Sequence, residues 1–264
     1  MLKRFFHFFQ SFIPSKHISS SNCSFSIDDA CNIVRSGDLV LISENEMSSR
    51  LVTTFCASQW SHVGIIYRPL DTDDEEPLLF EAVRVPDQLD VITKNYSGGV
   101  RLINFRNFLN TFKGNTVCIR LLGTSQKLDV SFKLEEHMTN IIHRMIDTYH
   151  GKPYEDRWME FFFAWGSVIY NRCETVDSFF CSELVAWCYI NAGIFNPQCK
   201  PASSFLPHCF SDTGSVTVIY PIVLPFPGLF IDQENDPIIK FSKEYYIDTN
   251  LKSKKCNMIL RFEN

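Results

Sequence analysis

The spacing of the apolar residues changes partway along the chain, and this change limits the folds that the sequence can adopt. In the first half the apolar residues form short runs of strand length, at 39–42, 62–67, 78–83, 91–92, 100–103 and 116–122. From Leu134 to Tyr149 they recur every three or four residues, which is the spacing of one helix face. Strands followed by helices favour an α+β fold over alternating β-α-β units.

Turn and capping residues indicate where further helices begin and end. Helices are predicted at 27–34, 47–55, 155–170 and 178–192, and one more strand at 216–220. Ser26 is a suitable N-cap for the first helix, and Gly151 and Gly193 lie where two helices should end. The Ser-rich stretch 15–26 is predicted to be a linker and the acidic stretch 71–77 a solvated loop. We therefore expect an N-terminal segment and linker over 1–26, one domain over 27–220, and an extension over 221–264 packed on that domain.

The charge and the hydropathy pattern exclude several functional classes. The net charge is −5, from 25 basic and 30 acidic residues, so a broad nucleic-acid-binding surface is not expected. The sequence has no apolar stretch of about 18 to 20 residues, the length that a membrane span needs. It also has no clear signal peptide, and the expected location is the cytoplasm, where thiols stay reduced.

The N-terminal residues 1–14 form an amphipathic pattern. On a helical wheel, one face carries Phe5, Phe6, Phe8, Phe9, Phe12 and Ile13, and the opposite face carries Lys3, Arg4 and His7. Such a helix can lie in a membrane interface, with the aromatic rings inserted and the cations against lipid headgroups. A peripheral membrane contact is therefore predicted. The alternative is a helix packed on the protein's own core.

The ten cysteines show no pattern typical of a metal or disulfide framework. They lie at 23, 31, 56, 118, 173, 181, 188, 199, 209 and 256, and no two have the C-x-x-C spacing. A zinc ribbon or a thioredoxin-type redox site has no support from this spacing. A disulfide scaffold is also not expected in a chain of 264 residues with so few cysteines.

One cysteine, Cys181, lies where a helix is predicted to begin. If Asp177 or Ser178 caps the helix, Cys181 falls in the first turn. The unpaired N–H groups and the dipole of a first turn stabilise an anion, and they favour a thiolate nucleophile there. The alternative is that Cys181 is a small buried apolar residue, as most free cysteines are.

A thiolate nucleophile needs a base, and His62 is the best-placed histidine. It opens the apolar strand 62–67, where the end of the strand can project its side chain into a cleft. Glu81 follows 19 residues later, as the carboxylate inside the apolar strand LLFEAV. A buried carboxylate is costly without a partner. Pairing with His62 would remove that cost and would hold the imidazole tautomer whose free nitrogen faces Cys181. The alternative is a hydrogen-bonded histidine with a structural role.

Five short motifs together resemble a known family. The segments SGDLVL, SHVGII, LLFEAV, GKPY and FCSELV, which lie between Gly37 and Gly193, resemble the circularly permuted papain-fold hydrolases of the NlpC/P60 superfamily. The most similar branch is the YiiX/YebB-like group, which also includes poxvirus proteins. The resemblance implies an antiparallel sheet or barrel packed against helices, with the cysteine at a helix N-terminus. It also implies that His62, Glu81 and Cys181 are catalytic and that Tyr154 of GKPY lines the site.

These observations predict a cysteine hydrolase that cleaves an amide bond through a thioester acyl-enzyme. Tyr154, Ser182 and the N–H groups at the start of the helix are the candidates for binding the oxyanion and the substrate. No metal or organic cofactor is required, and the substrate is expected to be peptide-like or acylated. A thiol-dependent lipid acyl hydrolase or acyltransferase at a membrane surface is a second hypothesis, although the chain has FCSEL where lecithin:retinol acyltransferase-like enzymes carry NCEHF. A catalytically silent module that binds a peptide or lipid is a third.

Overall fold

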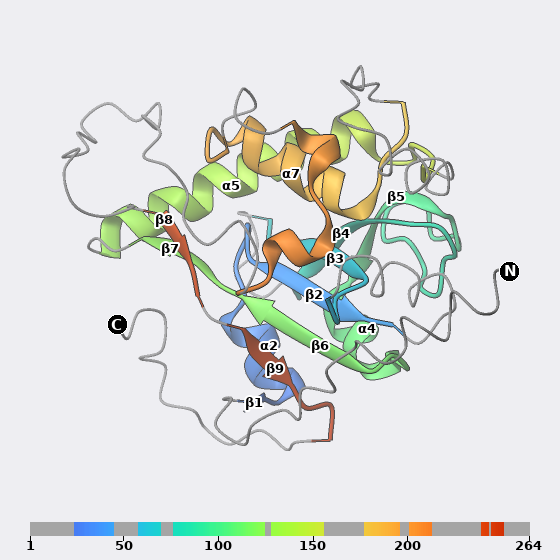
Figure 1. The fold of residues 1–264 in the computed structure, drawn as a ribbon, viewed down its shortest axis with the longest axis horizontal. Coiled ribbons are helices and arrows are strands. Elements are labelled where there is room, and N and C mark those ends of the chain that lie inside the picture. The colour runs from blue at the N-terminus through green and yellow to red at the C-terminus, as the bar shows by residue number, and fades with distance from the viewer. Residues whose placement is uncertain are drawn as a thin grey trace, which may run out of the picture.

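The computed structural model describes residues 24–44, 58–69, 76–124, 128–155, 177–195, 201–212, 239–242 and 244–250 (Figure 1). Four predicted elements lie outside these residues: the helices at 1–14, 47–55 and 155–170 (apart from Glu155) and the strand at 216–220. Within them, the architecture is a mixed α+β fold, as predicted.

The strands are β1 (Ser24–Phe25), β2 (Leu39–Ser43), β3 (His62–Tyr67), β4 (Leu78–Val83), β5 (Gly99–Asn104), β6 (Thr116–Arg120), β7 (Leu122–Thr124), β8 (Ile239–Phe241) and β9 (Tyr245–Ile247). The α-helices are α2 (Ile27–Ile33), α4 (Phe105–Thr111), α5 (Leu128–Tyr149) and α7 (Cys181–Asn191). Two short 3-10 helices, η2 (Ala202–Ser204) and η3 (Pro207–Phe210), follow α7.

Seven of the described strands form one sheet in the order β1-β9-β6-β2-β3-β4-β5, and β7 and β8 form a separate pair. Neighbouring strands are antiparallel except for β1 and β9, which are parallel. An antiparallel sheet was predicted, and this parallel edge pair is the exception. The described strands form an open sheet with β1 and β5 at its edges, so they do not close the barrel that was the alternative.

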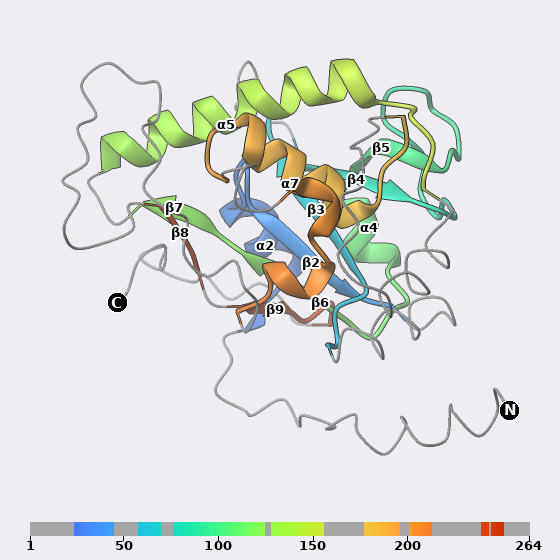
Figure 2. The same ribbon diagram turned by 45° about the horizontal axis from the view of Figure 1, so that its top comes forward.

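Helices cover both faces of this sheet (Figure 2). On one face, residues such as Leu41, Ile65 and Phe80 pack against α5 and α7. On the other face, residues such as Val40 and Ile66 pack against α2 and α4. A sheet that is buried on both faces needs apolar residues at successive positions, which explains the continuous runs LVLI and HVGIIY.

Local sequence explains several boundaries. Ser26 caps α2 as predicted: its Oγ accepts a hydrogen bond from the Asp29 N–H at 3.1 Å. The residues just before it, 24–25, form β1, so the predicted linker ends earlier than expected. Residues 91–92 form a turn rather than the predicted strand, because the Asp90 carboxylate accepts hydrogen bonds from the N–H groups of Ile92 and Thr93.

The predicted strand 116–122 is divided at Leu121, where the chain leaves the main sheet and β7 begins. The C-terminal strands join both sheets: β9 pairs with β6, and β8 pairs with β7. The Glu244 carboxylate joins this segment to the region before β3, since it accepts a hydrogen bond from Trp60 Nε1 at 3.0 Å. In the described part of the chain, no helix is both long enough and apolar enough to cross a bilayer.

Candidate active site

Helix α7 begins at Cys181, which is its first residue and is 5% exposed. The first-turn position predicted for this cysteine is therefore confirmed. The N-cap differs from the prediction: it is Phe180, whose backbone is extended and whose N–H lies 3.4 Å from Glu183 Oε2. The predicted caps are engaged elsewhere. The Ser178 hydroxyl donates to Glu155, and the Asp177 carboxylate lies 3.7 Å from Lys152 Nζ.

The chain before α7 is held by the segment that carries Tyr154. The Phe179 N–H donates to the Pro153 carbonyl, and the Glu155 N–H donates to the Phe179 carbonyl, both at 3.2 Å. These bonds keep residues 179 and 180 extended, so the helix cannot begin before Cys181. The first hydrogen bond within the helix runs from the Leu184 N–H to the Phe180 carbonyl at 3.0 Å. The N–H groups of residues 181–183 therefore have no carbonyl four residues earlier within α7 and point out of its first turn.

Two side-chain hydrogen bonds anchor α7 to neighbouring segments. The Ser182 hydroxyl donates to the Phe205 carbonyl at 2.7 Å, and the Tyr189 hydroxyl donates to the Gly37 carbonyl at 2.6 Å. The helix also packs directly on β3 and β4, the strands that carry His62 and Glu81. The position of Cys181 is thus set by contacts along the helix.

His62 and Glu81 form the predicted pair. The distance from His62 Nε2 to Glu81 Oε2 is 2.8 Å, and the two residues are 7% and 2% exposed. Because a carboxylate only accepts hydrogen bonds, Nε2 must carry the proton in this contact. The other ring nitrogen, Nδ1, is left for a second partner.

The Cys181 side chain lies close enough to the His62 imidazole to change its pKa, and Nδ1 is the ring nitrogen that the Glu81 contact leaves for it. Burial alone would lower the pKa of His62, but the Cys181 and Glu81 side chains outweigh burial and raise it well above its usual 6.5. Burial would likewise raise the pKa of Glu81, but the hydrogen bond from His62 and the charge of Arg101 keep that pKa low. The arrangement favours a charged imidazolium beside an ionised carboxylate.

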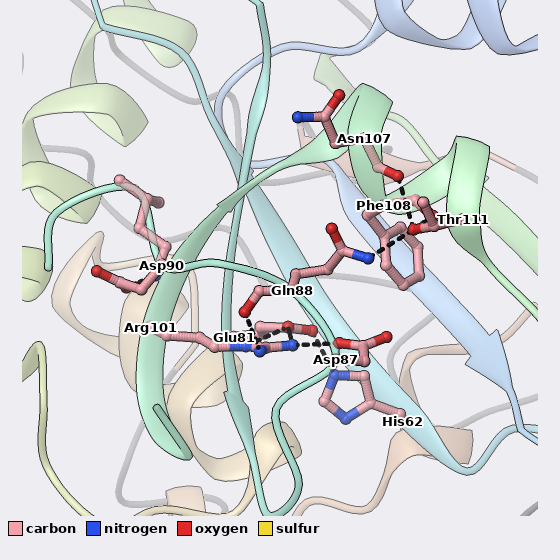
Figure 3. Close-up of polar contacts among 10 residues, drawn as sticks. His62, Glu81, Asp87, Gln88, Asp90, Arg101, Asn107, Phe108 and Thr111 are labelled. Carbon is pink, nitrogen blue, oxygen red and sulfur yellow. Dashed lines mark hydrogen bonds and ion pairs between the residues drawn. The ribbon is translucent and has the colours of Figure 1, made fainter. Parts of the chain in front are cut away.

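Arg101 completes this network, and the sequence analysis did not identify it (Figure 3). It lies directly across from Glu81 in the β4–β5 ladder, and it is 1% exposed. Both Nε and Nη2 donate to Glu81 Oε1, at 2.9 and 2.7 Å. The guanidinium also donates to the Asp87 carboxylate at 2.8 Å and to the Gln88 carbonyl at 3.2 Å. The missed signal was a charged residue inside an apolar strand, GVRLIN, which matches the reasoning that identified Glu81.

The two predicted oxyanion residues have different surroundings. The Tyr154 ring is half-buried and packs edge-on against the Phe180 ring, with centroids 5.9 Å apart, so it lies beside the residue that precedes Cys181. The Ser182 hydroxyl is occupied by the Phe205 carbonyl. Any contribution of Ser182 to an oxyanion site must therefore come from its backbone N–H.

The other described histidines bond elsewhere. His137, His143 and His150 contact the Ala192 carbonyl, the Tyr67 hydroxyl and the Asp90 carboxylate, each at 2.9 Å. His208 lies beside Cys209 in η3.

The remaining described cysteines, Cys31, Cys118, Cys188 and Cys209, are buried. Burial raises the pKa of the Cys31 thiol to about 12 and the pKa values of Cys118 and Cys188 well above the usual range. These thiols have the character of apolar core groups.

Comparisons with known proteins find similarity among solved structures. No family model matches the chain, and a search of curated proteins finds no match. Among solved structures, the chain is similar to the metalloprotein yiiX from Escherichia coli O157:H7, a DUF1105 protein. The identity is 19%, the TM-score is 0.40, and the match covers 80% of this chain and 98% of that one. Among the residues described here, no group of three or more His, Cys, Asp or Glu side chains is arranged to hold a metal ion. At this identity and score the likeness is weak, and the family of the chain stays a prediction.

Proposed function

We propose that this protein is a cysteine hydrolase that cleaves an amide bond, on a circularly permuted papain-like fold. One observation carries the proposal: Cys181 is the first residue of α7 and lies beside His62, whose Nε2 is bound by the buried Glu81. A nucleophile, a base that contacts it and a group that orients the base are the parts that covalent acyl transfer needs.

The chemistry follows from these positions. In the charged pair the proton of the Cys181 thiol has passed to the His62 imidazole, and the thiolate sulfur attacks the carbonyl carbon of the substrate. The N–H groups of residues 181 and 182 lie in the first turn of α7, where they can donate to the oxyanion. The imidazolium then gives its proton to the leaving amine as the C–N bond breaks, which leaves a thioester on Cys181. A water molecule, deprotonated by His62, hydrolyses the thioester and restores the thiol.

The thioester can be tested directly with an activated acyl donor. We expect that p-nitrophenyl acetate releases nitrophenol in a burst and leaves one acetyl group on Cys181, detected by intact and peptide mass spectrometry. Cys181→Ala should abolish the burst without unfolding the protein. Cys188→Ala removes another buried thiol of the same helix and should retain the burst. An acetyl group on a different residue, or a burst that survives in Cys181→Ala, would contradict the proposal.

The bond class needs a second assay, because an activated ester reports only the nucleophile. Incubation with a mixture of peptides and of N-acylated amines, followed by mass spectrometry, should yield new amines that depend on Cys181. Release of fatty acid from phospholipid vesicles, with no amine released from the amide substrates, would favour a lipid acyl hydrolase instead. A protein with no burst and no product in either assay would be the silent binding module.

The lipid alternative has one supporting observation in the described residues. The large apolar side chains that are exposed there, Val85, Leu89, Ile92 and Tyr96, all lie in the loop 84–98 between β4 and β5. This loop is tied to the site, since Arg101 binds both Asp87 and Glu81. Exposed apolar side chains on one loop can form a surface that meets a lipid or another protein.

Vesicle flotation tests this alternative. Vesicles of phosphatidylcholine and phosphatidylserine should carry the protein to the top of the gradient if the loop meets lipid, and the double variant Leu89→Ser, Ile92→Ser should then float less. A chain without residues 1–14 separates the contribution of the N-terminal segment. If the parent protein, the double variant and the chain without residues 1–14 all fail to float, the lipid alternative loses its support.

A further inference from the structure

We propose that Arg101 is a positioning residue, which keeps the Glu81 carboxylate a pure hydrogen-bond acceptor and so determines which nitrogen of the neutral His62 ring carries the proton. The inference rests on the proposed function, in which His62 is the base for Cys181. It adds a residue that touches neither the thiol nor a substrate.

The geometry assigns a separate task to each oxygen of Glu81. Oε1 accepts two hydrogen bonds from Arg101, at 2.9 and 2.7 Å, and Oε2 accepts one from His62 Nε2 at 2.8 Å (Figure 3). With Oε1 bound by two N–H groups, the carboxyl group cannot rotate without losing both bonds. Oε2 is thereby held where it meets the His62 ring.

The charge of Arg101 matters as much as its geometry. Glu81 is 2% exposed, and among the described residues its ion-pair partners are Arg101 on β5 and, when protonated, the His62 ring on β3. A buried carboxylate that loses one of two cationic partners binds a proton more readily. The pKa of Glu81 is lowered in part by the charge and the hydrogen bonds of Arg101, in keeping with this role.

Protonation of Glu81 would reverse the hydrogen bond to the imidazole. A protonated carboxyl donates its O–H to His62 Nε2, and a neutral imidazole that accepts at Nε2 must carry its proton on Nδ1. An Nδ1–H that faces Cys181 cannot take the thiol proton. Without Arg101, the same three side chains would remain together, but the base would be in the wrong tautomer.

The arrangement also explains why Arg101 is buried. Its other contacts, the Asp87 carboxylate and the Gln88 carbonyl, belong to the loop 84–98, so the guanidinium has acceptors on both sides. Asp87 is exposed, with 61% of its side chain accessible, whereas Arg101 is 1% exposed. The exposed carboxylate is the weaker partner, because solvent screens its charge. Asp87→Asn should therefore leave the tautomer of His62 unchanged.

Nuclear magnetic resonance can test the proposal without a substrate. In a Cys181→Ala background, which removes the thiol, the ¹⁵N shifts of neutral His62 should show the proton on Nε2, and the ¹³C shift of the Glu81 carboxyl should be that of a carboxylate at neutral pH. Arg101→Met should move the imidazole proton to Nδ1 and protonate Glu81. Arg101→Lys keeps the charge and should restore both signals. Arg106→Met, which removes an arginine that also binds two carboxylates, is the matched control and should change neither.

Retention of the Nε2–H tautomer with an ionised Glu81 in Arg101→Met would overturn the proposal. If Arg101→Met does not fold, the ¹³C shift of Glu81 in the parent protein is the remaining test. A protonated Glu81 carboxyl at neutral pH in the parent would also overturn the proposal. With the thiol restored, Arg101→Met should slow alkylation of Cys181 by about tenfold or more, the ratio that corresponds to one pKa unit. The tautomer assay and the acyl-enzyme assay can fail separately: a missing acyl-enzyme refutes the proposed function, and an unchanged tautomer refutes only the role of Arg101.

Discussion

The substitution Glu81→Gln tests how much the buried ion pair contributes to stability. It removes one negative charge and little volume, so packing against the neighbouring strands is preserved. The change leaves the Arg101 guanidinium, which is 1% exposed, without the carboxylate that it binds through two N–H groups. The remaining carboxylate on that guanidinium is Asp87, whose side chain is 61% exposed.

The size of the effect follows from this burial. Removing one partner of a buried ion pair costs about 3–5 kcal/mol, since the other charge is left buried and uncompensated. A glutamine oxygen can still accept a hydrogen bond, which places the expected loss near the lower figure, at about 3 kcal/mol. For a chain of this size, each kcal/mol lowers the melting temperature by about 2–4 °C, so a decrease of about 10 °C is expected.

Arg106→Met provides the control. Arg106 binds the carboxylates of Asp28 and Glu76, whose side chains are 58% and 43% exposed, so its loss should cost about 0–1 kcal/mol. Urea unfolding followed by circular dichroism gives both free energies on one scale. Equal effects of the two substitutions, or a Glu81→Gln protein as stable as the parent, would refute the reasoning.

Three further outcomes are expected. In the folded protein the pKa of His62 is raised above 6.5 and that of Glu81 is lowered below 4.5. The His62–Glu81 pair therefore contributes its full stabilisation between pH 4.5 and 6.5. This stabilisation is lost as pH rises through the folded pKa of His62 and as pH falls through the folded pKa of Glu81. The difference in unfolding free energy between the parent and His62→Asn should therefore be largest between pH 4.5 and 6.5, and a difference that grows outside this window would count against it. Ser182→Ala should cost about 1–3 kcal/mol in urea unfolding, because the buried Phe205 carbonyl loses the hydrogen bond from Ser182, and an unchanged free energy of unfolding would argue against that bond. Gly99→Ala should destabilise the protein, since a Cβ at its φ of 97° would clash with the Lys152 carbonyl, and an unchanged melting temperature would contradict this.

The sequence identified the parts of the site that depend on short-range pattern. Cys181 was assigned from its position at a helix start, and His62 and Glu81 from polar residues within apolar strands. These features are local, and all of them are present in the structure. The pairing of His62 with Glu81 followed because strands joined by one loop are commonly neighbours in a sheet.

The parts that the sequence analysis missed depend on register and on long-range contacts. Arg101 faces Glu81 only because β4 and β5 pair in one register, which a single sequence does not fix. The cap of α7 was misplaced because Phe179 is held by Pro153 and Glu155 from a distant segment. The turn at 91–92 was predicted as a strand because the side chain of Asp90, which bonds the local backbone, outweighs the β propensity of Val91 and Ile92.

The central claim is that Cys181 is a nucleophile because His62 lies beside it. Native protein should be treated briefly with iodoacetamide, and the modified sites should be mapped by peptide mass spectrometry. The account predicts that Cys181 reacts faster than Cys31, Cys118, Cys188 and Cys209, and that His62→Ala slows only Cys181, by about tenfold or more. If one of those four thiols reacts as fast as Cys181, or if His62→Ala leaves the Cys181 rate unchanged, the central claim is wrong.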